Sequence, residues 1–461
     1  MKSRLPLLGA IAMGCVLALG AIGAASGGVA AGDPDVWWVA AAGRESGWGM
    51  PLQTNFFSFT APEHPWVFHE WLAGPIYASG ASAFGTIFFA FVALVGLLSQ
   101  AGAAIAGALQ GERKEDAAGL LLALVWAVTV GFHGMSARVT VVVRVLPIAV
   151  ALLAFGRKFN WRHGAACVAL TFLWANVHGS FPLAFVLLAA GGLEGHRRAR
   201  WTTAALSVLA SLLTPHGLRV HQLALGYVFG DSSTLDVVHD HLVEFRPIWE
   251  HIDAAGALGR LALLAIALLA LGSLRRWPGR AGVVLLMTVL TIRHQRHLAL
   301  AILLAVPLLR PALARWIPEL RIDRKAVAIF ALGPAFVLGV AILVMTPAPQ
   351  AIGDPGFTEL VDRLPSGARV FVPMRFGGRV IWRRFPEVRP FYDSRNDCYP
   401  AEVAREGFEL PSTENAESTL VDRNVTHVII QEHHPLRVSW PVVARREGWV
   451  LYARPAATLS P

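Results

Sequence analysis

Two aspartates flank a proline at the start of the first polar stretch of the chain. Asp33, Pro34 and Asp35 are followed at once by Trp37 and Trp38. A carboxylate here could accept a proton as a general base or bind a metal ion. The alternative is that an aspartate caps the helix that follows, which is a common role for this residue. The tryptophan pair is typical of an anchor at a membrane interface.

A histidine and a glutamate stand side by side further along the same polar stretch. His69 and Glu70 lie in a segment, Pro65–Leu72, that leads into a short amphipathic helix expected along the interface. Neighbouring residues of a helix point to different sides, so we expect the two to be a poor pair with each other. Either could contact a substrate. The alternative is an interfacial helix whose polar residues are exposed to water and have no role in binding.

Arginines occur beside and inside apolar segments. Arg138 precedes such a segment and Arg144 lies within it, where a charge is costly and indicates function. Anion binding and a structural salt bridge or snorkelling both remain open for Arg144. The densest polar cluster lies between two other apolar segments and consists of Arg293, His294, Gln295, Arg296 and His297. Paired Arg and His donors suit a phosphate, and a basic patch on lipid headgroups is the alternative.

Two short breaks between apolar stretches each present a histidine. His178 lies in Asn176–Gly179, and His216 lies in Thr214–Gly217. Helix breaks are tolerated at membrane depth where they line a polar cavity. The alternative is an ordinary turn of a helical hairpin, where Gly and Pro are expected.

The elements that hold these residues must be strongly apolar. The chain of 461 residues is 55% hydrophobic and only 15% charged, with a mean hydropathy of +0.51, whereas soluble domains carry about 25% charged residues. This composition predicts an integral membrane protein. Lys and Arg beside apolar segments explain the net charge of +9, so no nucleic-acid partner is expected. Cys15, Cys167 and Cys398 show no metal-ligand spacing, which argues against a zinc site or structural disulfide.

About eleven apolar segments are candidate membrane helices, several of them short for a full span of roughly 20 residues. They are Leu5–Ala31, Ala83–Leu109, Ala117–Phe132, Val139–Phe155, Gly164–Ala175, Phe181–Leu193, Thr202–Leu213, Leu258–Leu274, Ala281–Ile292, Leu298–Leu309 and Ala326–Met345. The first is long for a cleaved signal peptide, so we expect a retained helix.

The positions of Lys and Arg predict the orientation of the membrane domain, residues 1–350. With the N-terminus inside, the inner loops and the N-terminus hold about 18 Lys and Arg, against about 8 outside. These inner loops are Gly111–Asp116, Arg157–His163, His196–Trp201, Arg275–Arg280 and Arg310–Lys325. The candidate residues then fall on the outer side, from the first outer loop, residues 32–82, onward. We expect the aspartates, histidines and paired arginines to share a water-filled hollow there.

The last part of the chain, residues 351–461, has a different composition. Charges become frequent, and short β-type runs alternate with helical stretches, which predicts a small extracytoplasmic α/β domain. Its strands are expected at Arg369–Val372, Val425–Ile430 and Trp449–Tyr452. A charged turn of Asp393, Arg395 and Asp397 is expected to be solvated, with acceptor binding as the alternative.

Taken in order, these motifs resemble those of the GT-C superfamily of membrane glycosyltransferases, and more narrowly a bacterial branch related to protein-mannosyltransferase-like enzymes. The matching residues are Asp33-Pro34-Asp35-Val36-Trp37-Trp38, Phe57-Ser58-Phe59-Thr60, His69-Glu70-Trp71-Leu72, Asn176-Val177-His178-Gly179, Pro215-His216-Gly217, Arg296-His297, Phe376-Gly377-Gly378 and Tyr392-Asp393-Ser394-Arg395. The chain departs from that branch at Val139, where the branch often has proline, and at Thr214–Gly217, where it often has Asn-Pro-Tyr-Gly.

The resemblance implies an all-α polytopic membrane domain of GT-C type in a bacterial inner membrane, with the small α/β domain outside. Such an enzyme moves a sugar from a polyprenyl-phosphate carrier to an acceptor, which could be a glycan, a lipid or a protein. Asp33 or Asp35 would serve as base or as ligand of a possible divalent metal. The residues implied to hold the leaving phosphate are Arg138, His178, Arg293, Arg296 and His297, while His69 and Glu70 would position substrate.

Two non-enzymatic alternatives remain open at this stage. One is a transporter or flippase for a lipid-linked saccharide, which needs polar residues along its whole path. The inner halves of the apolar segments contain few polar residues, which argues against it. The other is a scaffold in envelope assembly that uses the α/β domain for docking.

Overall fold

The computed structural model describes residues 33–109, 113–130, 136–229, 233–250, 254–317 and 354–455. These residues group into two compact units. The helical unit comprises the described parts of Ala90–His221 and Leu242–Thr346. The mixed unit comprises those of Ala31–Phe89, Gln222–His241 and Pro347–Pro461. Each unit is described by itself.

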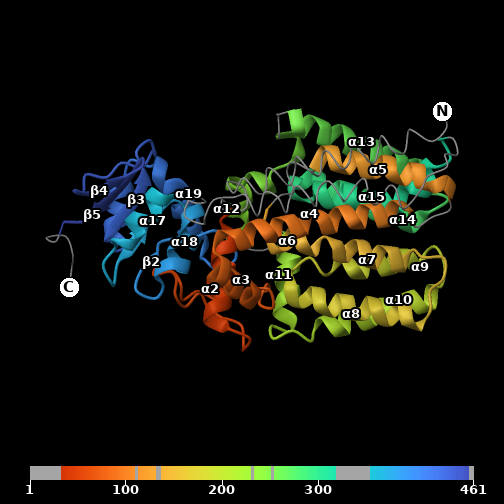
Figure 1. Cartoon of the computed structure of the whole chain (residues 1–461), viewed down its shortest axis with the longest axis horizontal. Coiled ribbons are helices and arrows are strands. Elements are labelled where there is room, and N and C mark those ends of the chain that lie inside the picture. Colours follow the sequence, from red (N-terminus) through yellow and green to blue (C-terminus); the bar gives the residue numbers. More distant parts are fainter. Residues whose placement is uncertain are drawn as a thin grey trace. The chain divides into compact units, whose positions relative to one another are not determined.

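The helical unit is built from apolar helices, of which α5, α13, α14 and α15 pack against one another (Figure 1). Its helices are α4 (Thr86–Leu109), α5 (Arg113–Val130), α6 (Val139–Val143), α7 (Val145–Ala154), α8 (Trp161–Val177), α9 (Leu183–Gly192), α10 (Arg197–Ser211), α13 (Ala254–Ser273), α14 (Pro278–Arg293) and α15 (Leu298–Leu313), with α11 (Leu218–Phe229) beginning here. Short 3-10 turns lie at η1 (Val243–Phe245), η2 (Ile248–Glu250) and η3 (Gln295–His297).

Nine of the predicted apolar segments, from Ala83–Leu109 to Leu298–Leu309, fall on these helices. Among the described residues, three helices are long and apolar enough to cross a membrane, namely Thr86–Leu109, Gly256–Ser273 and Gln295–Leu313. The predicted segments Leu5–Ala31 and Ala326–Met345 lie outside the described residues. The total of about eleven spans therefore stays a prediction.

Glycine allows the closest helix contacts of the helical unit. A Cβ atom at Gly279 in α14 would lie 2.0 Å from the carbonyl oxygen of Ala190 in α9. A Cβ at Gly119 in α5 would lie 2.5 Å from the backbone of Ala108 in α4. Helices packed in lipid gain mainly from such close backbone approach, because lipid tails are as apolar as the side chains.

The mixed unit contains a five-stranded sheet with helices packed against it. Its elements are α2 (Asp35–Ser46), α3 (Gly74–Phe84), α12 (Ser233–His241), α17 (Pro355–Asp362), β1 (Arg369–Phe371), α18 (Met374–Arg384), β2 (Arg389–Pro390), α19 (Ala401–Glu409), η5 (Leu410–Ser412), α20 (Ala416–Asp422), β3 (His427–Gln431), β4 (Val442–Arg446) and β5 (Trp449–Ala453). The strand order is β2-β1-β3-β5-β4, parallel around β1 and antiparallel around β5. The small C-terminal sheet is thus confirmed, with its three predicted strands at β1, β3 and β5.

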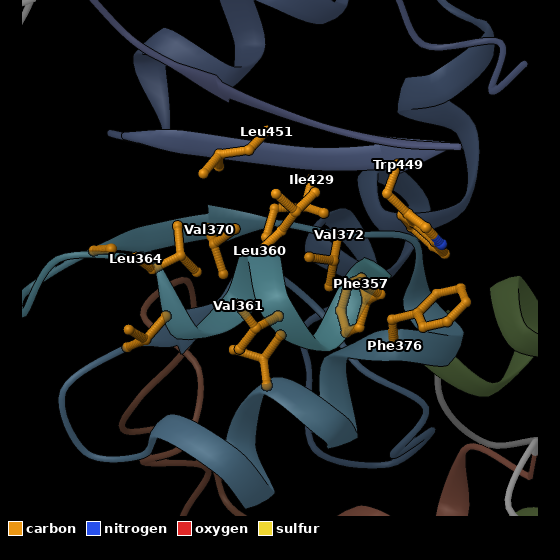
Figure 2. Close-up of a cluster of buried hydrophobic side chains, with 13 residues drawn as sticks. Phe357, Leu360, Val361, Leu364, Val370, Val372, Phe376, Ile429, Trp449 and Leu451 are labelled. Carbon is orange, nitrogen blue, oxygen red and sulfur yellow. The ribbon is translucent and has the colours of Figure 1, made fainter. Parts of the chain in front are cut away.

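An apolar cluster holds α17 and α18 against the sheet (Figure 2). Figure 2 shows Phe357, Leu360 and Val361 on α17, which lies next to Val370 of β1 and Leu451 of β5. All five side chains are buried. Burial of this apolar area is the main stabilising term for so small a sheet.

Helices α2 and α3 belong to the same unit as the C-terminal residues. Helices α2 and α3 cross where Gly43 meets Gly74, and a Cβ at Gly43 would lie 1.9 Å from the carbonyl carbon of Gly74. Helix α18 approaches α2 at Gly378, where a Cβ would lie 3.0 Å from the carbonyl oxygen of Pro34. Gly378 therefore lets α18 pack against the start of α2, while Gly377 faces the backbone at Tyr392 and Asp393. The division of the chain at residue 350 stays a prediction.

Two predictions of exposed side chains in this unit were wrong. Trp38 is buried, and so are Asp393 and Arg395. Trp38, taken for an interfacial anchor, is 7% exposed and packs edge to face on Trp66 and Phe68 at 5.9 and 6.2 Å between ring centroids. Asp393 and Arg395, expected in a solvated turn, are 0% and 1% exposed.

The buried charges of the C-terminal turn are paired within the unit. The Arg395 guanidinium donates to Asp393 Oδ2 and to Asn55 Oδ1, each at 2.6 Å, and lies 4.7 Å from the ring centroid of Trp66. Burial raises the pKa of the nearby Asp397 carboxyl to about 7. The prediction failed because the first outer loop supplies Asn55 and Trp66, which cover this turn.

Candidate active site

The Asp35 carboxylate lies in the first turn of α2 and is held by two hydrogen bonds. Pro34 precedes the helix with a φ of −64°, which suits a helix start. Ser394 Oγ donates to Asp35 Oδ1 across 2.8 Å, and Trp38 Nε1 donates to the same oxygen across 3.2 Å. The partly exposed carboxylate is therefore fixed in one orientation, as a proton acceptor in catalysis must be.

The neighbouring Asp33 has a different local role. Its Oδ1 accepts a hydrogen bond from the backbone N–H of Asp35 at 3.0 Å. This bond satisfies one of the N–H groups that the start of a helix leaves without an intrahelical partner. Of the two aspartates, Asp33 thus takes the capping role that sequence analysis considered, and Asp35 presents its side chain from the helix.

His69 and Glu70 lie in a turn, His69–Ala73, that leads into α3. The helix expected at this position begins only at Gly74, and the prediction that the two side chains diverge was wrong. Because a turn does not separate neighbouring side chains as a helix does, His69 Nε2 lies 4.0 Å from Glu70 Oε1. The His69 Nδ1 atom lies 3.3 Å from the carbonyl oxygen of Val67.

A buried tyrosine lies close to both carboxylates of this region. Burial, the Glu70 carboxylate and the Asp33 carboxylate, in that order, raise the pKa of Tyr77 well above its ordinary value. Sequence analysis missed Tyr77 because a tyrosine in a short apolar helix, α3, has the ordinary pattern of a core residue. Glu70 itself is 7% exposed, so negative charge is concentrated near the starts of α2 and α3.

The helical unit contains a second cluster, centred on a glutamate. Arg138 Nη1 donates to Glu244 Oε2 at 2.8 Å, and Arg296 Nη1 lies 3.7 Å from Glu244 Oε1. Burial raises the pKa of Glu244, but Arg138 and Arg296 lower it by more, with help from Arg144, so the net pKa is below the ordinary value. The glutamate is charged at neutral pH and shared by two arginines. Sequence analysis missed it because Glu244 lies between the predicted apolar segments Thr202–Leu213 and Leu258–Leu274, where nothing local marks this position.

The polar cluster between α14 and α15 is placed by η3. The Gln295 N–H donates to the Arg246 carbonyl at 3.0 Å, and His294 Nδ1 lies 2.6 Å from the Phe245 carbonyl oxygen. These bonds fix η3 on η1. The Arg296 guanidinium then lies 4.4 Å from the Phe245 ring centroid, which is a favourable cation–π distance.

The remaining members of this cluster differ in their surroundings. The His297 ring lies 6.4 Å from the His294 ring, at the start of α15. Arg293 ends α14, is exposed, and forms no ion pair with a described residue. Arg144 lies at the break between α6 and α7, as an arginine inside a predicted span. Arg138 and Arg296 therefore both pair with Glu244, and the positive charge of Arg144 helps to lower the pKa of the same carboxylate.

His178 is buried at the end of α8 between two hydroxyl groups. Its Nε2 lies 3.0 Å from Thr140 Oγ1, and its Nδ1 lies 2.9 Å from Ser180 Oγ. Thr140 is in α6, two residues after Arg138, so this histidine is close to the arginine that binds Glu244. His216 is also buried, in a turn where Gly217 has a φ of +52°.

The predicted site residues thus form two clusters, one in each unit. Asp33, Asp35, His69 and Glu70 lie in the mixed unit, and the arginines with His178 and His297 lie in the helical unit. The expectation that all of them share one hollow stays a prediction. Ser394, which sequence analysis quoted only as part of a motif, contributes directly to the first cluster.

No family model and no curated protein matches this sequence. Among solved structures, ArnT from Cupriavidus metallidurans bound to undecaprenyl phosphate is similar with a TM-score of 0.52, at 14% identity, over 97% of this chain and 98% of that chain. The oligosaccharyltransferase of Archaeoglobus fulgidus, in complex with Zn and sulfate, is similar with a TM-score of 0.50, at 13% identity, over 90% of this chain and 68% of that chain.

Both of these proteins are GT-C glycosyltransferases. The chain therefore has the GT-C fold, and the resemblance predicted from its motifs is confirmed at that level. The narrower bacterial branch related to protein-mannosyltransferase-like enzymes stays a proposal.

Proposed function

We propose that this protein is a membrane glycosyltransferase that moves a sugar from a polyprenyl-phosphate carrier to an acceptor. The observation that carries the proposal is Asp35, which is held by Ser394 and Trp38 at the start of α2 in a chain with the GT-C fold. The undecaprenyl phosphate bound by the similar ArnT supports a polyprenyl carrier. We place the enzyme in a bacterial inner membrane, with the N-terminus in the cytoplasm and the C-terminal domain outside.

In the proposed reaction, a hydroxyl oxygen of the acceptor attacks the anomeric carbon of the sugar. The bond between that carbon and the phosphate oxygen breaks, and its electron pair stays on the polyprenyl phosphate. The acceptor proton moves to the Asp35 carboxylate, which acts as general base. The hydroxyl of Ser394 and the indole N–H of Trp38 keep the carboxylate in place.

The leaving phosphate gains negative charge as its bond to the sugar breaks. Cationic donors aimed at that charge lower the barrier. We assign this role to the arginines that surround Glu244, Arg138 and Arg296, together with Arg144. His178, Arg293 and His297 are further candidates in the same unit. Glu244 would hold the two guanidinium groups in position, because its two carboxylate oxygens lie 2.8 Å from Arg138 Nη1 and 3.7 Å from Arg296 Nη1. Guanidinium groups bind phosphate well.

A divalent metal remains compatible with the residues of the mixed unit. His69 Nε2 and Glu70 Oε1 are 4.0 Å apart, and two ligands bound about 2.0–2.2 Å from one ion can be no further than about 4.4 Å apart. These two side chains would hold such an ion, and Asp33 and Asp35 are further carboxylates of the same unit. A bound metal would supply Lewis-acid polarisation. The zinc in the crystals of the similar oligosaccharyltransferase supports testing this.

The test in cells uses Asp33→Ala, Asp35→Ala and the double variant, expressed in a strain that lacks the chromosomal copy. We expect Asp35→Ala to abolish the glycan or lipid modification that the wild-type chain restores, while the variant protein accumulates normally in the membrane. The exposed Glu63 lies in the same loop, and Glu63→Ala is the matched control. Full modification in the double variant would overturn the mechanism. Transport of a lipid-linked saccharide by the purified wild type, without any glycosyl product, would favour a flippase instead.

A further inference from the structure

One cavity lined by described residues of the helical unit is cationic. It has a volume of about 1080 Å³. Its charged lining consists of Arg157, Arg200, Arg276, Arg280 and Arg310, with the two glutamates Glu115 and Glu194. The arginines exceed the glutamates by three positive charges. Such a surplus in a closed space attracts an anion.

Arg200 is the strongest sign that an anion binds here. It is 2% exposed, and its guanidinium donates only to backbone carbonyls, those of Gly191, Gly195 and Gly156, at 2.9, 2.7 and 2.6 Å. Among the described residues no carboxylate forms an ion pair with it, and its Nε has no hydrogen-bond partner. The Glu194 carboxylate acts on Arg200 electrostatically without binding it directly, and a bound anion would compensate the remaining cost of burying this charge.

The two glutamates of the cavity are already engaged. Arg280 binds Glu194 through its side chain and through its backbone N–H, both at 2.8 Å. Arg310 lies 3.5 Å from Glu115. The carboxylates therefore bind these two arginines directly, and the cavity keeps a surplus of positive charge that includes Arg200.

The cavity lies where a lipid headgroup would reach it. All five loops that the positive-inside rule places on the cytoplasmic side contribute lining residues, from Glu115 in the first to Arg310 in the last. The lining also includes apolar side chains, among them Leu152, Leu193 and Leu308. Arg276 stacks on Trp277 at 5.0 Å from the ring centroid, and tryptophan is enriched at the level of the headgroups. Charge and apolar surface together fit an amphiphile rather than a soluble anion.

We infer that this cavity binds the phosphate headgroup of an anionic phospholipid from the cytoplasmic leaflet. Arg200 and Arg276 would donate to the phosphate, and the leucines would contact the first part of the acyl chains. This inference is independent of the proposed transferase reaction, because it uses none of the residues assigned to that reaction.

The test measures lipid binding to the purified full-length chain by native mass spectrometry. Dioleoylphosphatidylglycerol is compared with dioleoylphosphatidylcholine, which has the same acyl chains and no net charge. We expect selective retention of phosphatidylglycerol by the wild type. Arg276→Ala should weaken it about fivefold, since a basic residue near a headgroup contributes about 1 kcal/mol. Arg157→Ala combined with Arg276→Ala should weaken it about 25-fold on the same basis.

The matched control is Arg275→Ala, because Arg275 is exposed and adjacent but does not line the cavity. Arg275→Ala should retain wild-type lipid binding. That result would show that Arg276→Ala weakens lipid binding through the cavity and not through the loss of one positive charge at the surface. Equal retention of both lipids by the wild type, or equal losses in the two single variants, would overturn the inference. Displacement of the lipid by an equal concentration of inorganic phosphate would overturn the lipid source in favour of a free phosphate.

Discussion

Ser394 donates a hydrogen bond from its Oγ to Oδ1 of Asp35 across 2.8 Å, although the two residues are 359 positions apart in the chain. The bond links the C-terminal part of the mixed unit to the start of its first helix. The carboxylate proposed as the base therefore depends on a residue that is remote in sequence. This makes Ser394 a positioning residue whose loss can be separated from a loss of folding.

Ser394→Ala removes this hydrogen bond, and we expect kcat for sugar transfer to fall about tenfold with little change in KM. A hydrogen bond to a charged group contributes about 1.5–3 kcal/mol. A loss of about 1.4 kcal/mol in transition-state stabilisation lowers the rate about tenfold. The measurement is steady-state kinetics with the purified enzyme. Ser394→Thr keeps the hydroxyl and should recover most of the rate, whereas the exposed Ser412→Ala should have no effect. A change in KM alone would assign Ser394 to substrate binding.

Glu244 gives a prediction for the dependence of stability on pH. Its pKa in the folded protein lies below the ordinary value of 4.5, because Arg138 and Arg296 outweigh the effect of burial. The stability that this group contributes is fully present above about pH 4.5 and is lost as the pH falls through its lowered pKa. We therefore expect the Tm of the wild type to fall more steeply below pH 4.5 than that of Glu244→Gln.

Thermal unfolding in detergent between pH 3 and pH 7 provides the comparison. Glu250→Gln, at the exposed last residue of η2, is the control and should follow the wild-type curve. Parallel curves for the wild type and Glu244→Gln would contradict the shared ion pair as the structure has it.

The contact between α14 and α9 predicts opposite effects at two glycines of one helix. Gly279→Ala would put a methyl group 2.0 Å from the carbonyl oxygen of Ala190, and we expect a loss of about 2 kcal/mol in stability from overpacking. Gly282, in the same helix, has no heavy atom within 4 Å of its Cβ position. Gly282→Ala should be neutral or raise stability by up to about 1 kcal/mol. Thermal unfolding of both variants tests the packing, which an equal effect of the two substitutions would contradict.

The long helices could be predicted from the sequence because a run of apolar residues long enough to enter a bilayer leaves the backbone few options other than a helix. The nine predicted segments within the described residues are therefore helical. Helices α11 and α12 were not predicted, because they lie in the polar segment Thr214–Gly256, where no run of apolar residues marks them.

The sequence predicted which types of residue form the site better than it predicted which residues pair with one another. Asp33 and Asp35 were selected because a carboxylate at this position could act as a base or a metal ligand. Arg296 was selected because paired Arg and His donors suit a phosphate. Glu244 and Asn55 were not, since each gains its role only from a partner far away in the chain. Local sequence shows the charge of a residue, while burial and pairing depend on which distant segment covers it.

The central claim is that Asp35 accepts the proton of the acceptor in a sugar transfer from a polyprenyl phosphate. Its most direct test is the release of polyprenyl phosphate from a panel of synthetic polyprenyl-phosphate sugars, with purified wild type, Asp35→Asn and Glu63→Gln in vesicles that contain an acceptor-rich envelope extract. We expect at least about a 100-fold loss for Asp35→Asn, the lower range for removal of a general base, with unchanged donor binding and full activity for Glu63→Gln. Wild-type release by Asp35→Asn would contradict the claim.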